Sequence, residues 1–225
     1  MGTLYIVATP IGNMEDITLR ALRVLGEADI ILAEDTRVTG KLLKRHGISG
    51  TMKSYHQRSA HSVADEILKL LGEGKTLALV TDAGTPGIAD PGNELVARIV
   101  RELPDVRTEP IPGASSLSAA LSICGFPTNE FVFLGFLPHK KGRQTLLNEM
   151  QTMERTVVLF ESPHRIGKLL SELAERVPER RAFIARELTK LHESHYRGTV
   201  SELKSAFDSG RIIEKGEFVV VLGQS

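Results

Sequence analysis

Short, almost wholly apolar runs alternate with amphipathic helical periodicity through the first half of this chain, and few folds allow that alternation. The runs cover residues 4–8, 30–33 and 77–81, as is typical of strands buried on both faces of a parallel sheet. Between and after them, apolar residues recur every three or four positions around 17–28, 63–71 and 95–103. With a further strand expected at 106–111, this half predicts an α/β domain.

The pattern changes near residue 113, where proline and glycine cluster around a short predicted helix at 115–124. Beyond it, apolar runs predict a second set of strands at 131–134, 157–160, 183–185 and 218–222. A strong amphipathic helix is expected at 166–177. We therefore predict two α/β domains, residues 1–113 and 114–225, the first of which contains the loops rich in glycine and proline.

Composition excludes several classes of protein. No apolar stretch approaches the roughly 20 residues that a membrane span requires, and no charged segment precedes a long apolar one as in a signal peptide. The single cysteine, Cys124, excludes an internal disulfide framework and a zinc site built from several thiolates. We expect a cytoplasmic chain of enzyme size.

The charge balance is neutral, with 28 basic and 28 acidic side chains. Proteins that bind nucleic acid mainly through phosphate contacts usually have a basic excess, so a nucleic-acid partner would have to be contacted through local patches. The available clusters are Lys41-Lys44-Arg45, Lys140-Lys141-Arg143 and Arg180-Arg181. Taken alone, each is expected to be a solvated helix end or loop.

Small and polar residues follow the predicted strands of the first domain, in segments 9–13, 34–37, 82–92 and 112–116. The longest of these, 82–92, has three glycines and two prolines in eleven residues. Glycine lets a backbone approach a ligand closely, and proline fixes the shape of a loop. Ligands of open α/β sheets bind beyond the carboxyl ends of the strands, so these segments predict a binding site.

Several familiar motifs are absent. Gly74-Lys75-Thr76 looks like the end of a phosphate-binding P-loop, but Lys69 stands where the first glycine is required, and the segment precedes a strand instead of following one. The dinucleotide-binding glycine pattern and the nucleophile elbow are also missing. His192-Glu193-Ser194-His195 is one residue too short for a zinc-protease helix, so we expect no metal site.

Two charged segments follow strands in the second domain. Glu161-Ser162-Pro163-His164-Arg165 follows the run at 157–160, and Ser162 and Pro163 suit the first positions of a helix. Arg186-Glu187-Leu188-Thr189-Lys190 follows the run at 183–185. Helix capping does not require these charges, so they mark either a surface ion-pair network or a functional site.

These segments belong to a set of motifs that resembles the tetrapyrrole-methylase superfamily of S-adenosylmethionine (SAM) methyltransferases. The chain is most similar to its small-subunit ribosomal RNA (cytidine-2′-O)-methyltransferase I family. The motifs are LYIVATPIGNMEDIT at 4–18, AEDTRVTGKLL at 33–43, VTDAGTPGIADPG at 80–92, PIPGASSLSAAL at 110–121, FLGFLPHKKGRQ at 133–144, LFESPHRI at 159–166 and ARELTKLHESHYRGTVSEL at 185–203. Together they span nearly the whole chain in the order of the family.

The resemblance implies a two-domain fold with a mostly parallel sheet first and a mixed sheet second, and with SAM bound between the domains. By position in the motifs, the cofactor-binding residues are expected to be Pro10, Ile11, Asp82, Gly84, Thr85, Ile88, Ser115, Ser116, Phe160, Glu161 and Leu188. Related tetrapyrrole methylases have an aspartate in the place of Thr85. That difference is a feature of the ribosomal RNA branch.

The implied reaction is the attack of a cytidine ribose 2′-oxygen on the methyl group of SAM, without a metal. A base must take up the hydroxyl proton, and the candidates at predicted strand ends are Asp35, Glu161, Glu187 and Lys190. Lysine would act as a base only if its pKa were lowered. The side chains expected to hold substrate phosphates are those of Arg37, Arg165 and Arg186.

Two features depart from the family pattern. Tyr55-His56 is followed by Gln57-Arg58 where the family often has an acidic, histidine-containing stretch, and many members continue past residue 225 into a small helical extension. The resemblance also implies a homodimer acting on ribosomal RNA in the small subunit. Two alternatives stay open, namely methylation of a tetrapyrrole or other small molecule, and a SAM-binding assembly factor without catalysis.

Overall fold

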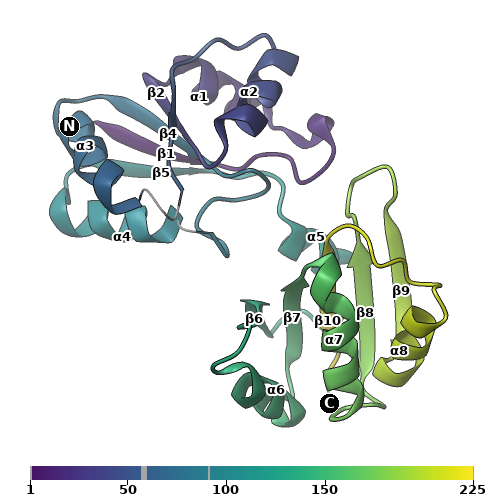
Figure 1. Ribbon diagram of the computed structural model, residues 1–225. Helices are drawn as coiled ribbons and strands as arrows, with labels where there is room; N and C mark the ends of the chain where they lie inside the picture. Colours follow the sequence, from purple (N-terminus) through teal and green to yellow (C-terminus); the bar gives the residue numbers. More distant parts are fainter. Residues whose placement is uncertain (1, 57–59, 91, 225) are drawn as a thin grey trace. The chain divides into compact units, whose positions relative to one another are not determined.

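The computed structural model describes residues 2–56, 60–90 and 92–224, so the Gln57-Arg58 departure lies outside the described residues. The chain divides into two compact units, Met1–Ser115 and Ser116–Ser225, and Figure 1 shows that each consists of a sheet with helices packed on it. The predicted division at residue 113 lies two residues earlier. No helix in the described part of the chain is long and apolar enough to cross a membrane.

The first unit is built on a five-stranded sheet in which every pairing is parallel. Its strands lie in the order β3-β2-β4-β1-β5, with bounds β1 Thr3–Val7, β2 Ile30–Ala33, β3 Met52–Ser54, β4 Thr76–Val80 and β5 Arg107–Ile111. The central strands are almost wholly buried, which accounts for their apolar runs.

Helices cover both faces of this sheet, as two separate apolar clusters show. On one face, Leu4, Leu32 and Leu77 pack against α3 (Ala60–Gly72) and α4 (Gly92–Glu102). On the other face, Val7, Ile31 and Ala78 pack against α1 (Leu19–Glu27) and α2 (Thr36–Arg45). A 3₁₀ turn, Met14–Asp16, precedes α1. The predicted doubly covered parallel sheet is confirmed.

The second unit contains a mixed five-stranded sheet in the order β6-β7-β10-β8-β9. Its strands are β6 Phe131–Phe136, β7 Thr156–Glu161, β8 Arg181–Arg186, β9 Ser194–Thr199 and β10 Phe218–Leu222. Only β6 and β7 are parallel neighbours, and the other three pairings are antiparallel. The mixed sheet that the resemblance implies is therefore confirmed.

One large apolar cluster fills the second unit between its sheet and three helices (Figure 1). These are α6 (Arg143–Thr152), α7 (Pro163–Ala174) and α8 (Val200–Asp208), while α5 (Ser116–Ile123) contacts β10. β7 and β8 both run antiparallel to β10, so they point the same way. The carboxyl ends of β6, β7 and β8 consequently meet at one edge of the sheet, which we call the second sheet edge.

Candidate functional site

The loops that leave the first sheet are tied together at its carboxyl edge. Thr9 and Gly84 form a two-way backbone bridge, with N···O distances of 2.9 and 3.1 Å. The Thr9 hydroxyl donates to the carbonyl of Thr81 at 3.0 Å, and the Thr85 hydroxyl donates to the carbonyl of Ala114 at 3.4 Å. The segments predicted to form a site thus belong to one connected structure.

Glycine is required at position 84, where φ is +86° and a Cβ atom would stand 3.4 Å from Cγ2 of Ile11. Among the predicted cofactor residues nearby, Ile11 is buried, Pro10 and Thr85 are half-buried, and Ile88 is 47% exposed. Ser115 is also half-buried. This edge therefore offers an apolar surface beside backbone and hydroxyl groups.

Three carboxylates, those of Glu34, Asp35 and Asp82, lie at the same edge of the first sheet. Glu34 accepts a hydrogen bond from the Thr81 hydroxyl at 2.6 Å, and Asp82 accepts one from the backbone N–H of Asp35 at 3.0 Å. Partial burial, followed by the neighbouring charge of Glu34, raises the pKa of Asp82 above its ordinary value. Glu34 was not among the predicted site residues, although it precedes Asp35 in the same strand-end segment.

Asp35 and Arg37 are engaged with each other. Asp35 is the N-cap of α2, and its carboxylate accepts hydrogen bonds from the backbone and side chain of Arg37, the shortest at 2.6 Å. The Arg37 side-chain hydrogen bonds lower the pKa of Asp35 to about 2. A carboxylate this acidic is a weak proton acceptor, so its capping role accounts for Asp35 better than a role as base.

This pairing predicts a pH-dependent difference between the wild type and Asp35→Asn. Asparagine caps a helix about as well as aspartate, so the substitution removes mainly the charge. Because folding lowers the pKa, the stabilisation is complete above the unfolded value of about 4 and is lost as the pH falls towards about 2. Thermal unfolding should show the wild type more stable at pH 6 and the two proteins equal near pH 2. A difference that persists at pH 2 would contradict the assignment.

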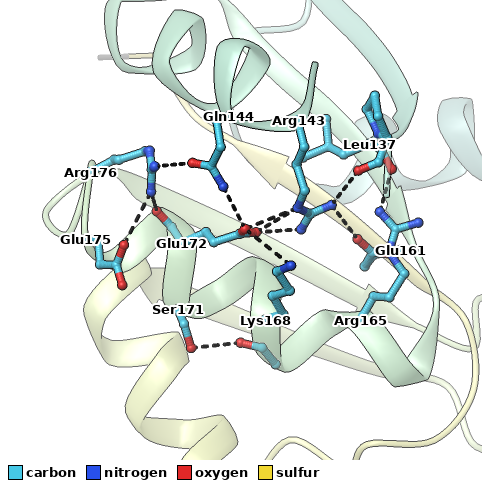
Figure 2. Close-up of polar contacts among 12 residues, drawn as sticks. Leu137, Arg143, Gln144, Glu161, Arg165, Lys168, Ser171, Glu172, Glu175 and Arg176 are labelled. Carbon is cyan, nitrogen blue, oxygen red and sulfur yellow. Dashed lines mark hydrogen bonds and ion pairs between the residues drawn. The ribbon is translucent and has the colours of Figure 1, made fainter. Parts of the chain in front are cut away.

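In the second unit, the structure places Glu161 in an ion-pair network (Figure 2). Its side chain is fully buried, with Oε1 3.3 Å from Nε of Arg165 and Oε2 4.0 Å from Nη1 of Arg143. It also accepts from the backbone N–H of Ser162 at 2.8 Å. The structure therefore gives Glu161 and Arg165 a structural role. Glu161 as base and cofactor ligand, and Arg165 as a phosphate contact, stay predictions.

The prediction that Lys140-Lys141-Arg143 is a solvated cluster is wrong for Arg143, which is only 2% exposed. The same holds for Arg180, which is 7% exposed. The guanidinium of Arg180 donates to four backbone carbonyls, those of Met150, Met153, Arg155 and Gly223. Of the cluster residues around these two, Lys140, Lys141 and Arg181 are exposed as expected.

Glu187 and Lys190 form an ion pair in the segment that follows β8. Nζ of Lys190 lies 2.9 Å from a carboxylate oxygen of Glu187 and 2.9 Å from one of Glu217. Partial burial alone would lower the pKa of Lys190, but these two hydrogen bonds leave it raised. Burial would likewise raise the pKa of Glu187, but its bonds to Lys190 and to the backbone of Glu217 leave it lowered. The condition for Lys190 to act as a base is not met here.

Two further predicted residues, Arg186 and Leu188, lie in the same segment as Glu187 and Lys190. Arg186 is 6% exposed and donates to the carbonyls of His192 and Lys215, so it holds two loops together. Leu188 is buried, and Glu187 and Thr189 on either side of it have positive φ angles of 54° and 65°. Such strain in non-glycine residues is most often found at functional sites.

Phe160 and Ser116 complete the predicted set within the second unit. Phe160 lies edge-on to Phe133 and Phe136 on the neighbouring strand β6, with ring centroids 4.9 and 5.7 Å away. Ser116 is half-buried at the first position of α5. No group of three or more potential metal ligands occurs in the described residues.

Comparison with known proteins gives consistent matches. Residues 3–204 match the family model of Tetrapyrrole (Corrin/Porphyrin) Methylases. Ribosomal RNA small subunit methyltransferase I of Neisseria meningitidis (serogroup A, strain Z2491) is 49% identical over 98% of this chain and 76% of its own length. The protein of the same name from Thermotoga maritima is 47% identical over 99% of this chain and 98% of its own length.

A solved structure shares the fold. Uroporphyrin-III C-methyltransferase from Thermus thermophilus, complexed with S-adenosylhomocysteine, superposes with a TM-score of 0.68 over 99% of this chain and 97% of its own, at 21% identity. With nearly the whole chain matched by the family model and by close relatives, this protein belongs to the tetrapyrrole methylase family.

Proposed function

We propose that this protein transfers a methyl group from SAM to the ribose 2′-hydroxyl of a cytidine in the RNA of the small ribosomal subunit. The observation that carries the proposal is the near-full-length similarity, at 47–49% identity, to relatives named as small-subunit ribosomal RNA methyltransferases. Thr85, in the position where related tetrapyrrole methylases have an aspartate, supports the ribosomal RNA branch over tetrapyrrole methylation.

SAM is the methyl donor. It fits the carboxyl edge of the first sheet, where β1, β2, β4 and β5 end, which we call the first sheet edge. Its adenosine and methionyl parts need apolar surface and hydrogen-bond partners, which the exposed Ile88 and the half-buried Pro10 and Thr85 supply. The cofactor supplies a methyl group already activated by a positively charged sulfur. We place it at this edge, with Pro10, Asp82 and Ser115 beside it.

The task left to the protein is to align the attacking oxygen with the methyl group and to accept one proton. Alignment can supply up to about 7–11 kcal/mol of the barrier, whereas a general base typically adds 10²–10⁴-fold. Among the candidate bases, the pKa values of Asp35 and Glu187 are lowered and that of Lys190 is raised, so these three are poor proton acceptors near neutral pH. Asp82 has a raised pKa and lies on the proposed cofactor edge, so we add it to the candidates for the proton acceptor.

Replacing Lys190 with methionine should reduce turnover roughly 10- to 100-fold, by analogy with the loss of one positioning contact, and should leave SAM affinity unchanged. The ammonium group holds the carboxylates of Glu187 and Glu217 together beside strained backbone, so its loss frees that segment. Steady-state kinetics and calorimetry with SAM measure the two quantities. Unaffected turnover would remove Lys190 from the site.

Methyl transfer from radiolabelled SAM tests the proposed function directly. The acceptors are small ribosomal subunits that lack their native modifications, free ribosomal RNA and a tetrapyrrole. We expect label on a cytidine 2′-oxygen of the RNA. Label on the tetrapyrrole would support the alternative substrate, and SAM binding with no labelled acceptor would support a non-catalytic assembly factor. The homodimer stays a prediction, which sedimentation of the same preparation tests.

A further inference from the structure

The loop between β6 and α6, residues 137–142, exposes a run of basic side chains at the second sheet edge. His139, Lys140 and Lys141 are all exposed, and no described residue forms a hydrogen bond or ion pair with either lysine side chain. Many other surface cations of the chain are paired, such as Arg98 with Glu102 and Lys204 with Asp208. These two lysines therefore present uncancelled positive charge.

The backbone of this loop is held by two arginines, the buried Arg143 and the half-buried Arg165 (Figure 2). Leu137 is 1% exposed, and its carbonyl accepts a hydrogen bond from Arg165. The Pro138 carbonyl accepts one from Nη1 of Arg143 at 3.4 Å, and the Lys140 carbonyl accepts from the backbone N–H of Arg143 at 3.2 Å. Main-chain carbonyls are thus fixed while the lysine side chains point to solvent.

The arginines are in turn fixed by buried carboxylates. Arg143 makes a two-pronged contact with Glu172, at 2.9 Å from Nε and 2.6 Å from Nη2, and its Nη1 lies 4.0 Å from Glu161. Arg165 pairs with the other oxygen of Glu161 at 3.3 Å. Lys168 adds a third cation, with its Nζ 4.0 Å from Glu172. The two carboxylates are therefore already paired within the network, which orders the loop without neutralising Lys140 or Lys141.

A chain with no net charge must bind a polyanion through local patches, and a rigid loop with two free ammonium groups is such a patch. We propose that loop 137–142 binds the phosphate backbone of the RNA through Lys140 and Lys141, and that Arg143 and Arg165 are positioning residues that hold its main chain in place. This inference rests on the proposed function, because it assumes an RNA substrate.

The double variant Lys140→Ala/Lys141→Ala tests the surface. We expect KM for the small subunit to rise roughly tenfold and the slope of log affinity against log salt to become shallower by about 1.4–1.8, as for two lost phosphate contacts. SAM affinity and kcat should not change. The charge-matched control Lys41→Ala/Lys44→Ala removes two exposed lysines from α2. Equal effects from both variants, or an unchanged KM, would overturn the proposal.

The variant Arg165→Lys tests the positioning role, since it keeps a charge beside Glu161 but loses the fork that also reaches the Leu137 carbonyl. If Arg165 acts through the loop, KM should rise by far more than kcat falls. The triple variant Lys140→Ala/Lys141→Ala/Arg165→Lys should then have a KM no higher than that of Lys140→Ala/Lys141→Ala. Additive effects would instead mean that Arg165 contacts RNA independently, which overturns the positioning role.

The two proposals fail in different ways. If the wild type labels no RNA, the proposed function fails whatever the loop does. If the wild type labels RNA and the lysine variant retains its KM and salt slope, only the loop inference fails.

Discussion

Replacing Thr85 with tryptophan should abolish SAM binding, raising the dissociation constant more than 100-fold and removing methyl transfer. Thr85 lies in the loop after β4, half-buried, with its hydroxyl 3.4 Å from the Ala114 carbonyl of the neighbouring strand-end loop. An indole ring cannot occupy that narrow space and must turn into the surface where we place the cofactor. A loss this large corresponds to at least about 2.7 kcal/mol, and calorimetry with SAM measures it.

Thr85→Ser is the matched control, because it retains the hydroxyl and should bind SAM within a fewfold of the wild type. Since the substitution is in a loop and not in either core cluster, both variants should unfold near the wild-type temperature. Unchanged SAM affinity in a folded Thr85→Trp protein would show that the cofactor does not bind at the first sheet edge.

Replacing Arg143 with methionine should lower the free energy of unfolding by roughly 3–5 kcal/mol, because removing one partner of a buried ion pair leaves an uncompensated charge. Arg143 is 2% exposed, and its loss leaves the buried carboxylates of Glu172 and Glu161 without their shared cation. Urea unfolding measures the effect. The activity of this variant does not test the loop, because a loss of activity could come from unfolding as well as from movement of the loop.

Two further variants show whether the loss of stability comes from the buried charge. Arg101→Met removes an arginine from a surface pair and should change stability by less than about 1 kcal/mol. Arg143→Met/Glu172→Gln removes both members of the strongest pair and should recover part of the loss, because one buried charge is no longer stranded. A full loss in the double variant would indicate that packing of the arginine stem, and not charge pairing, stabilises this region.

The sequence predicts the central strands well but misses β3 and β9, two of the four edge strands, for a physical reason. β2, β4 and β10 are enclosed on both faces and must be apolar throughout, so their runs are visible in the sequence. β3 and β9 lie at sheet edges, and many of their residues are polar and at least partly exposed, for example Lys53 and Ser54 in β3. No apolar pattern distinguishes them from loops.

The same reasoning applies to the candidate site. The rule that ligands bind at strand ends identifies the loops of the first sheet edge, because direction and register follow from parallel pairing. That rule cannot show that Asp35 forms an ion pair with Arg37. Nor can it show that Arg143 is buried while the neighbouring Lys140 and Lys141 are exposed. Burial of a charged side chain depends on partners far away in the chain, here Glu172.

The position of β10 has a consequence for biosynthesis. All five strands of the first sheet are complete by residue 111, whereas the second sheet needs its last strand, Phe218–Leu222, at the centre between β7 and β8. Domains generally fold in order as they leave the ribosome. The first unit can therefore fold during translation, while β7 and β8 must wait, unpaired with each other, until the final strand emerges to join them. Nascent chains stalled before residue 218 should expose these two apolar strands to chaperones.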